Sequence, residues 1–141
     1  MTKIALEDQL CFPLYAASRL MTRKYQPMLD QLGITYPQYL VMMVLWGENQ
    51  QTVSAIGEKL FLNSNTLTPL LKRLQQLDLV TRERNPQDER QVLISLTEKG
   101  KSLHDQAYCY LEPMITAGDN REAQNLRKML NKLIHLLDDE Q

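Results

Sequence analysis

The chain has 141 residues, of which 43% are hydrophobic and 23% charged, so one globular domain is expected rather than a disordered chain. No apolar run approaches the roughly 20 residues that cross a bilayer, and the N-terminal segment carries acids where a signal peptide needs apolar residues. We therefore expect a cytoplasmic protein. The formal net charge of −1 excludes a surface that is basic throughout, although a local basic patch is enough to bind phosphates.

The first predicted element is a long helix from Leu6 to Leu32, because apolar residues recur there at spacings of three and four. Gly33 is expected to end it as a left-handed cap. A second helix opens at Tyr36-Pro37 and runs to about residue 46. Since it is apolar on nearly every side, it is expected to be buried.

Two shorter helices follow. Thr52 is the expected N-cap of the third helix, and the fourth begins near residues 63–65 and ends near Leu77. The fourth helix has an apolar stripe opposite a polar face. The stripe consists of Leu67, Leu70, Leu71, Leu74 and Leu77.

The pattern then changes to that of a β-hairpin, with strands over residues 79–84 and 91–96 and a charged tip between them. Two more helices are expected over residues 98–116 and 120–137. The predicted fold is mainly α with a small β-hairpin. A helix pair followed by a hairpin is the layout of a winged helix-turn-helix.

The fourth helix is the candidate reader of DNA, although a helix of this pattern is often only a surface helix. Its short polar side chains would contact base edges in a major groove, and basic residues one turn further on would contact phosphates. At the hairpin tip, Arg90 would enter a minor groove while Asp88 orients an arginine. The candidate DNA-binding residues are Asn65, Thr66, Thr68, Pro69, Lys72, Arg73, Arg84, Asp88 and Arg90.

Short motifs in this region resemble the multiple-antibiotic-resistance regulator (MarR) family. They are Thr66-Leu-Thr-Pro-Leu-Leu-Lys-Arg-Leu, Leu79-Val-Thr-Arg, Asp88-Glu-Arg and Leu96-Thr-Glu-Lys-Gly. The resemblance covers nearly the whole chain. It implies an obligate homodimer on a pseudo-palindromic operator in double-stranded DNA, with half-sites about 34 Å apart. In this single domain, about residues 1–35 and 98–141 would form the dimerisation helices, and about residues 36–97 the winged helix-turn-helix.

Cys11 is the candidate reactive residue. A lone cysteine in an apolar helix is usually an inert core residue. Cys11, however, lies near a helix N-terminus, where the helix dipole favours a thiolate, and Pro13 supports a helix start close by. The chain has six tyrosines and only two phenylalanines. A nearby phenol would therefore be available to donate a hydrogen bond to the sulfur.

The motif Leu10-Cys-Phe-Pro-Leu-Tyr-Ala-Ala-Ser, with Tyr25 and Gly33-Ile-Thr-Tyr-Pro-Gln-Tyr-Leu downstream, is similar to the organic hydroperoxide resistance branch of the family. This resemblance implies that Cys11 is oxidised by an organic hydroperoxide and that Tyr25 and Tyr36 hydrogen-bond its sulfur. Reduced protein would repress its target, and oxidation to the sulfenic acid would release the operator.

Cys109 leaves two interpretations open. By the same resemblance it is a candidate resolving cysteine that forms an intersubunit disulfide with Cys11, but it lies about two turns before the expected position. Otherwise it is a structural thiol, and a small cellular thiol would cap Cys11. His104, His135 and the cysteines show no ligand spacing, so neither a metal nor a cofactor is expected.

Three alternatives remain at this point. A repressor of the same family could be released by a small phenolic ligand instead of a peroxide. A thiol peroxidase would be an enzyme, but the chain lacks the strand-rich α/β pattern of thioredoxin-like proteins, so no catalytic residue is assigned. A helical scaffold without DNA binding is the third.

Overall fold

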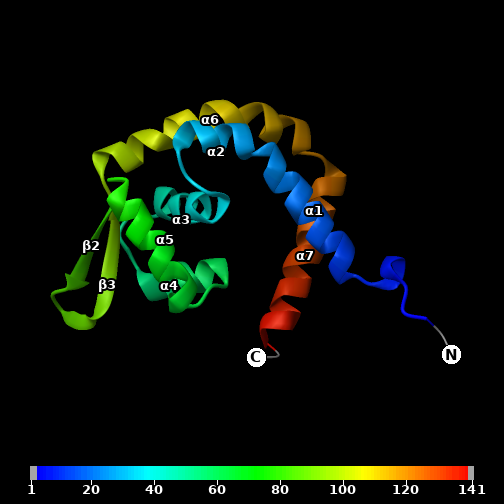
Figure 1. Ribbon diagram of the computed structural model, residues 1–141, viewed down its shortest axis with the longest axis horizontal. Coiled ribbons are helices and arrows are strands. Elements are labelled where there is room, and N and C mark those ends of the chain that lie inside the picture. Colours follow the sequence, from blue (N-terminus) through cyan, green and yellow to red (C-terminus); the bar gives the residue numbers. More distant parts are fainter. Residues whose placement is uncertain (1–2, 140–141) are drawn as a thin grey trace. The chain divides into compact units, whose positions relative to one another are not determined.

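The computed structural model describes residues 3–139, which form helices and a small antiparallel sheet (Figure 1). No helix within that range is long and apolar enough to span a membrane. The predicted mainly α fold with one hairpin is confirmed. The elements are the 3-10 helix η1 (Leu6–Asp8), α1 (Cys11–Lys24), α2 (Gln26–Leu32), α3 (Tyr36–Gly47), β1 (Gln51–Thr52), α4 (Val53–Leu60), α5 (Ser64–Gln76), β2 (Val80–Asn85), β3 (Asp88–Leu96), α6 (Glu98–Gly118) and α7 (Arg121–Asp139).

The single helix predicted for residues 6–32 is wrong, because the chain forms η1, α1 and α2 there. Pro27 breaks it, since it has no N–H to donate to the Arg23 carbonyl and its ring collides with that carbonyl in a continuing helix. Tyr25 stands between α1 and α2 and donates its N–H to the Thr22 carbonyl at 3.0 Å, a tighter turn than an α-helix makes. Pro27 is thus the residue in the sequence that marks this break.

The next helices begin and end where the sequence predicts. Gly33 follows α2 in the left-handed conformation, with φ of 74°. Thr52 Oγ1 accepts the Ala55 N–H at 3.0 Å at the start of α4, and Asn63 Oδ1 accepts the Thr66 N–H at 2.9 Å at the start of α5. These caps satisfy backbone donors that a first helical turn leaves unpaired.

The core of the central part lies among α3, α4, α5 and the sheet, which pack on one another (Figure 1). The leucine stripe predicted for α5 is the inner face of that helix, so its polar face is turned outward. Each fully buried apolar side chain there stabilises the fold by roughly 1.5–3 kcal/mol. The buried residues of this core include Met42, Leu45, Ile56, Leu67, Leu71, Leu74 and Ile94.

The sheet has the strand order β1-β3-β2, and both pairings are antiparallel. The hairpin β2–β3 is confirmed, whereas the two-residue strand β1 was not predicted. Its Gln51 is buried and pairs with Ile94 of β3. Two residues carry too little pattern for a sequence argument to find such a strand.

The chain divides into two compact parts, one up to Gln106 and one from Ala107 onward. In the second part, α7 is amphipathic but buries none of its side chains. Leu126, Met129 and Leu136 are each more than half exposed, at 55%, 69% and 62%. An apolar surface of this kind marks a face that a partner covers.

Gly100, in the first turn of α6, packs so closely on the segment before β2 that a Cβ there would overlap the Leu79 carbonyl oxygen. We predict that Gly100→Ala lowers the free energy of unfolding by about 1–3 kcal/mol, because backbone must shift to admit the methyl group. Urea denaturation at fixed protein concentration measures this. Gly47→Ala is the matched control, since nothing lies within 4 Å of its added Cβ. Equal stabilities of the two variants would contradict the prediction.

Candidate functional site

The outward face of α5 carries most of the predicted DNA-binding residues. Asn65, Thr66, Pro69 and Lys72 are exposed, and the helix contains two basic residues and no acidic one. Thr68 is only half exposed, and its hydroxyl donates to the Ser64 carbonyl at 2.7 Å. The face is therefore polar, positively charged and anchored from behind by buried leucines. Such a face suits contact with phosphates and base edges.

Arg73 is exposed as well, and because it follows Pro69 by four residues it lies on the same face of α5. It lines a cavity of about 450 Å³ together with Asp30 and Tyr36, which belong to α2 and α3. Its guanidinium donates to Gln76 Oε1 at 3.3 Å. Arg73 therefore belongs to the outward face of α5 and also borders the cavity that Tyr36 lines.

The hairpin tip shows the arginine–aspartate arrangement that the sequence predicts. Asp88 Oδ1 accepts hydrogen bonds from the backbone N–H of Arg90 at 3.1 Å and from its Nε at 3.2 Å. The Arg90 side chain is still 92% exposed. Arg84 is held within the hairpin, because its Nη1 donates to the Glu89 carbonyl at 2.8 Å. Asp88 thus aims Arg90 outward without covering it.

Cys11 is the first residue of α1, which confirms its predicted place at a helix N-terminus. Pro13 fits there because the N–H that it lacks has no helical partner in a first turn. The Cys11 side chain is exposed. The helix N-terminus offers partial positive charge to an anionic sulfur.

Three tyrosines form a cluster where α1, α2 and α3 meet, and we call Tyr25, Tyr36 and Tyr39 the tyrosine cluster. Ring centroids lie 5.7 Å apart for Tyr25–Tyr36, 6.1 Å for Tyr25–Tyr39 and 5.9 Å for Tyr36–Tyr39. The structure thus brings together the two predicted tyrosines. Tyr39 was not assigned, although its place three residues after Tyr36 on a helix puts both on one face.

Cys11 does not reach the tyrosine cluster of its own chain. Cys11 is the first of the 14 residues of α1 and Tyr25 follows the last, which places them about 21 Å apart along the helix axis. No hydrogen bond joins Cys11 to these tyrosines in the described part of the chain. One chain therefore holds the two halves of the predicted site at opposite ends of one helix.

The phenols of the cluster are held in their neutral form. Burial raises the pKa of Tyr36 above its usual value, and the neighbouring Tyr25 adds to this. Burial, with the neighbouring phenols adding to it, raises the pKa of Tyr39 to about 12. At neutral pH the hydroxyls of Tyr36 and Tyr39 keep their protons and can donate hydrogen bonds to an anion.

Cys109 is exposed on α6 and has no disulfide, and His104 stacks edge-on against Trp46 with ring centroids 5.4 Å apart. Among residues 3–139, no group of three or more histidine, cysteine or acidic side chains could hold a metal ion. Within residues 3–139, the candidate reactive groups are therefore the cysteine thiols and the clustered tyrosine phenols.

Comparisons with known proteins bear on both sites. The family model "Transcriptional regulator SarA/Rot" matches residues 23–107. The organic hydroperoxide resistance transcriptional regulator of Bacillus subtilis (strain 168) is 48% identical over 133 residues, which is 94% of this chain and 90% of that protein.

Solved structures of AbfR, a protein of Staphylococcus epidermidis, are also similar. Overoxidised AbfR bound to DNA is 42% identical with a TM-score of 0.81, covering 94% of this chain and 94% of that one. AbfR with a disulfide formed is 42% identical with a TM-score of 0.66, covering 95% of this chain and 90% of that one.

The burial of Tyr39 predicts a specific loss of stability at alkaline pH. The pKa of its phenol is near 10 in the unfolded chain and about 12 in the folded one, so between these values the native state keeps a proton that the unfolded state has lost. The free energy of unfolding should then fall by about 2–3 kcal/mol more in wild type than in Tyr39→Phe as pH rises from 10 to 12. Urea titrations along this range test it. Tyr15→Phe, at an exposed tyrosine, should follow wild type, and parallel curves for Tyr39→Phe would refute the assignment.

Proposed function

Because this chain belongs to the MarR family, in its organic hydroperoxide resistance branch, we propose that oxidation of Cys11 makes it release its operator DNA. It is a winged-helix transcription regulator and not an enzyme. The observation that carries the proposal is an exposed cysteine at a helix N-terminus together with a cluster of tyrosines that includes Tyr25 and Tyr36. We place this repressor in the cytoplasm, where its DNA is.

The reading head supplies the contacts to DNA. The N-terminal half of α5 enters the major groove, where Asn65, Thr66, Thr68 and Pro69 face the bases. Lys72 follows one turn later and binds phosphate. The remaining phosphate and groove contacts come from residues outside this half of the helix. They are Arg73, Arg84 and Arg90, with Asp88 holding Arg90 in place.

The functional unit is a homodimer on a pseudo-palindromic operator. Apolar side chains of α1 and α7 that no described residue covers become its interface. On α1 and its N-cap these are Leu10, Phe12, Tyr15 and Leu20, exposed to between 44% and 65%. A symmetric pair sets the spacing between two reading heads, so a change at the interface alters how both heads meet their half-sites.

Dimerisation also completes the sensor. Since α1 keeps Cys11 about 21 Å from the tyrosine cluster of its own chain, the thiolate binds the cluster of its partner instead. Two-fold symmetry then makes two equivalent sites, because each Cys11 meets the Tyr25 and Tyr36 of the other protomer. The exposed Cys11 and the apolar face of α1 around it support this arrangement.

The sensing step is a two-electron oxidation. The Cys11 thiolate attacks one oxygen of an organic hydroperoxide, the O–O bond breaks, and an S–O bond forms. With one proton taken up, the products are the sulfenic acid and the alcohol derived from the hydroperoxide. A thiol then attacks the sulfenic sulfur, which gives a disulfide and water.

Loss of negative charge at the sulfur triggers release. A thiolate accepts phenol hydrogen bonds, whereas a sulfenic acid or a disulfide is neutral and accepts them weakly. The AbfR structures are consistent with this step: overoxidised AbfR is bound to DNA, while the disulfide form differs more in shape from this chain. Oxidation that preserves the charge would therefore leave the repressor bound.

The partner thiol is either Cys109 or a small molecule. The chain has two cysteines, so a disulfide between Cys11 and a different position of the protein must use Cys109. Cys109 is exposed on α6, and this exposure supports its access to another chain. If it does not react, a small cellular thiol caps Cys11.

Operator binding before and after organic hydroperoxide tests the function. At fixed salt, wild type should lose affinity roughly 5–150-fold on treatment with cumene hydroperoxide, the usual range of allosteric coupling. Cys11→Ser should bind the same DNA and ignore the peroxide. Cys109→Ser should still respond, and intact mass would show whether its Cys11 carries a small thiol. Release of Cys11→Ser by peroxide would contradict the sensor, and release only by a phenolic compound would identify a ligand-operated repressor.

Mixed dimers test whether the site forms between protomers. In a dimer of one Cys11→Ser chain and one Tyr25→Phe chain, the intact Cys11 meets an intact partner tyrosine, so half of the fast peroxide reaction should remain. A dimer of wild type with the double variant offers its one intact Cys11 only a phenylalanine, so the fast reaction should vanish. Stopped-flow oxidation of the two mixtures, purified with different tags, gives the rates. The opposite pattern would show that the site lies within one chain.

A further inference from the structure

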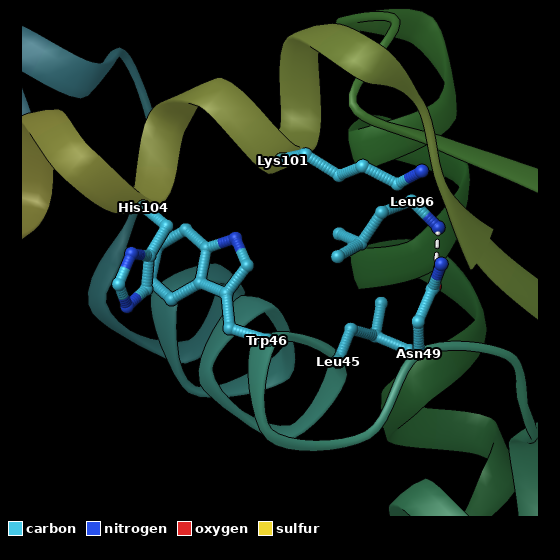
Figure 2. Close-up of a pocket in the computed structure, with 6 residues that line it drawn as sticks. All are labelled: Leu45, Trp46, Asn49, Leu96, Lys101 and His104. Atoms are coloured by element: carbon cyan, nitrogen blue, oxygen red, sulfur yellow. Dashed lines mark hydrogen bonds between the residues drawn. The ribbon is translucent and has the colours of Figure 1, made fainter.

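Helix α3 joins the tyrosine cluster to the base of the hairpin, and an aromatic row follows it. Tyr36 and Tyr39 stand at its N-terminal end. The Tyr39 and Trp46 ring centroids are 6.2 Å apart, and those of Trp46 and His104 are 5.4 Å apart. Rings at such separations are in packing contact, so displacement of one is felt by the next. Figure 2 shows Trp46 and His104 side by side where this row ends.

A hydrogen bond also connects the aromatic row to the first turn of α6. Trp46 Nε1 donates to the Gly100 carbonyl at 2.9 Å. Gly100 in turn packs against the Leu79 carbonyl at the start of the hairpin and close to the Leu96 side chain at its end. The indole therefore holds the place where both ends of the hairpin meet α6.

A second bond ties the end of α3 to the hairpin itself. Asn49 Oδ1 accepts the Leu96 N–H at 2.8 Å and the Gln50 N–H at 2.9 Å (Figure 2). Gln50 has a positive φ of 63°, so the chain turns sharply at this point. Asn49 thus fixes the loop after α3 to the last residue of β3.

We propose that Trp46 and Asn49 are positioning residues that transmit the state of the tyrosine cluster to the hairpin. This inference rests on the proposed function and specifies its regulation. When the phenols lose their anion, α3 shifts, and its two bonds to Gly100 and Leu96 carry the shift to the wing.

The packing of α3 makes it suitable for this task. Val41, Met42 and Leu45 are fully buried, and Tyr39 is 3% exposed. Close-packed helices do not deform smoothly but move as bodies between discrete positions. A displacement at Tyr36 is therefore passed along α3 to its C-terminal end. There, hydrogen bonds from Trp46 to Gly100 and from Leu96 to Asn49 connect this end of the helix to α6 and to β3.

Variants that remove either bond test the proposal. Asn49→Ala and Trp46→Phe should bind operator in the reduced state within about twofold of wild type and should react with cumene hydroperoxide at the wild-type rate. The ratio of oxidised to reduced dissociation constants should fall about fivefold for each bond lost, the usual weight of one hydrogen bond. Asn49→Asp keeps the acceptor oxygen, so it should restore the wild-type ratio.

Trp46 is the only tryptophan of the chain, and its emission gives a second readout. Peroxide should change this emission in wild type and in Asn49→Ala, because the row still moves, but not in Cys11→Ser. An unchanged affinity ratio in Asn49→Ala, an equal weakening of both states, or no recovery in Asn49→Asp would each overturn the proposal. A wild type that ignores peroxide would instead remove the proposed function, so the two failures are distinguishable.

Discussion

The 14-residue helix α1 begins at Cys11 and ends just before Tyr25 of the same chain. The chain cannot close this distance while α1 stays helical, because the helical rise fixes its length. In the proposed sensor the phenols donate at one end of α1 and the thiolate accepts at the other, so a second copy of the chain joins them. In this proposal dimerisation sets the spacing of the reading heads and also assembles the sensor. The same interface therefore affects both DNA binding and the reaction with peroxide.

Helix α3 has a comparable double role. Its buried side chains form much of the core under α4 and α5, while its N-terminal turn carries two tyrosines and its C-terminal end holds the base of the hairpin. A softer connection would absorb a small change at the tyrosines. A helix whose Val41, Met42 and Leu45 are fully buried does not absorb it, because a shift creates voids that cost on the order of 1 kcal/mol for each methyl-sized gap. In the proposed coupling the core is therefore the transmitting element.

Local chemistry made much of this predictable from sequence. Gly33, Thr52 and Asn63 set helix boundaries through caps that involve only neighbouring residues, and the leucine stripe of α5 gave its inner face. The break at Tyr25 was missed because apolar spacing continues across it while Pro27 forbids the helix. The Trp46–Gly100 and Asn49–Leu96 bonds join residues 54 and 47 positions apart, and nothing in a sequence pattern announces them.

The burial of the tyrosine cluster explains why so small a change at one sulfur is enough. Phenols are protonated at neutral pH and burial raises the pKa of Tyr36 further, so in the proposed site Tyr36 remains a hydrogen-bond donor. A hydrogen bond to a charged acceptor contributes roughly 1.5–3 kcal/mol, and two phenols lose theirs together when the thiolate becomes neutral. The coupling between an effector and a distant site is typically about 1–3 kcal/mol. In the proposed sensor, the loss of two such hydrogen bonds is at least as large as a typical coupling free energy, without any larger rearrangement at the cysteine.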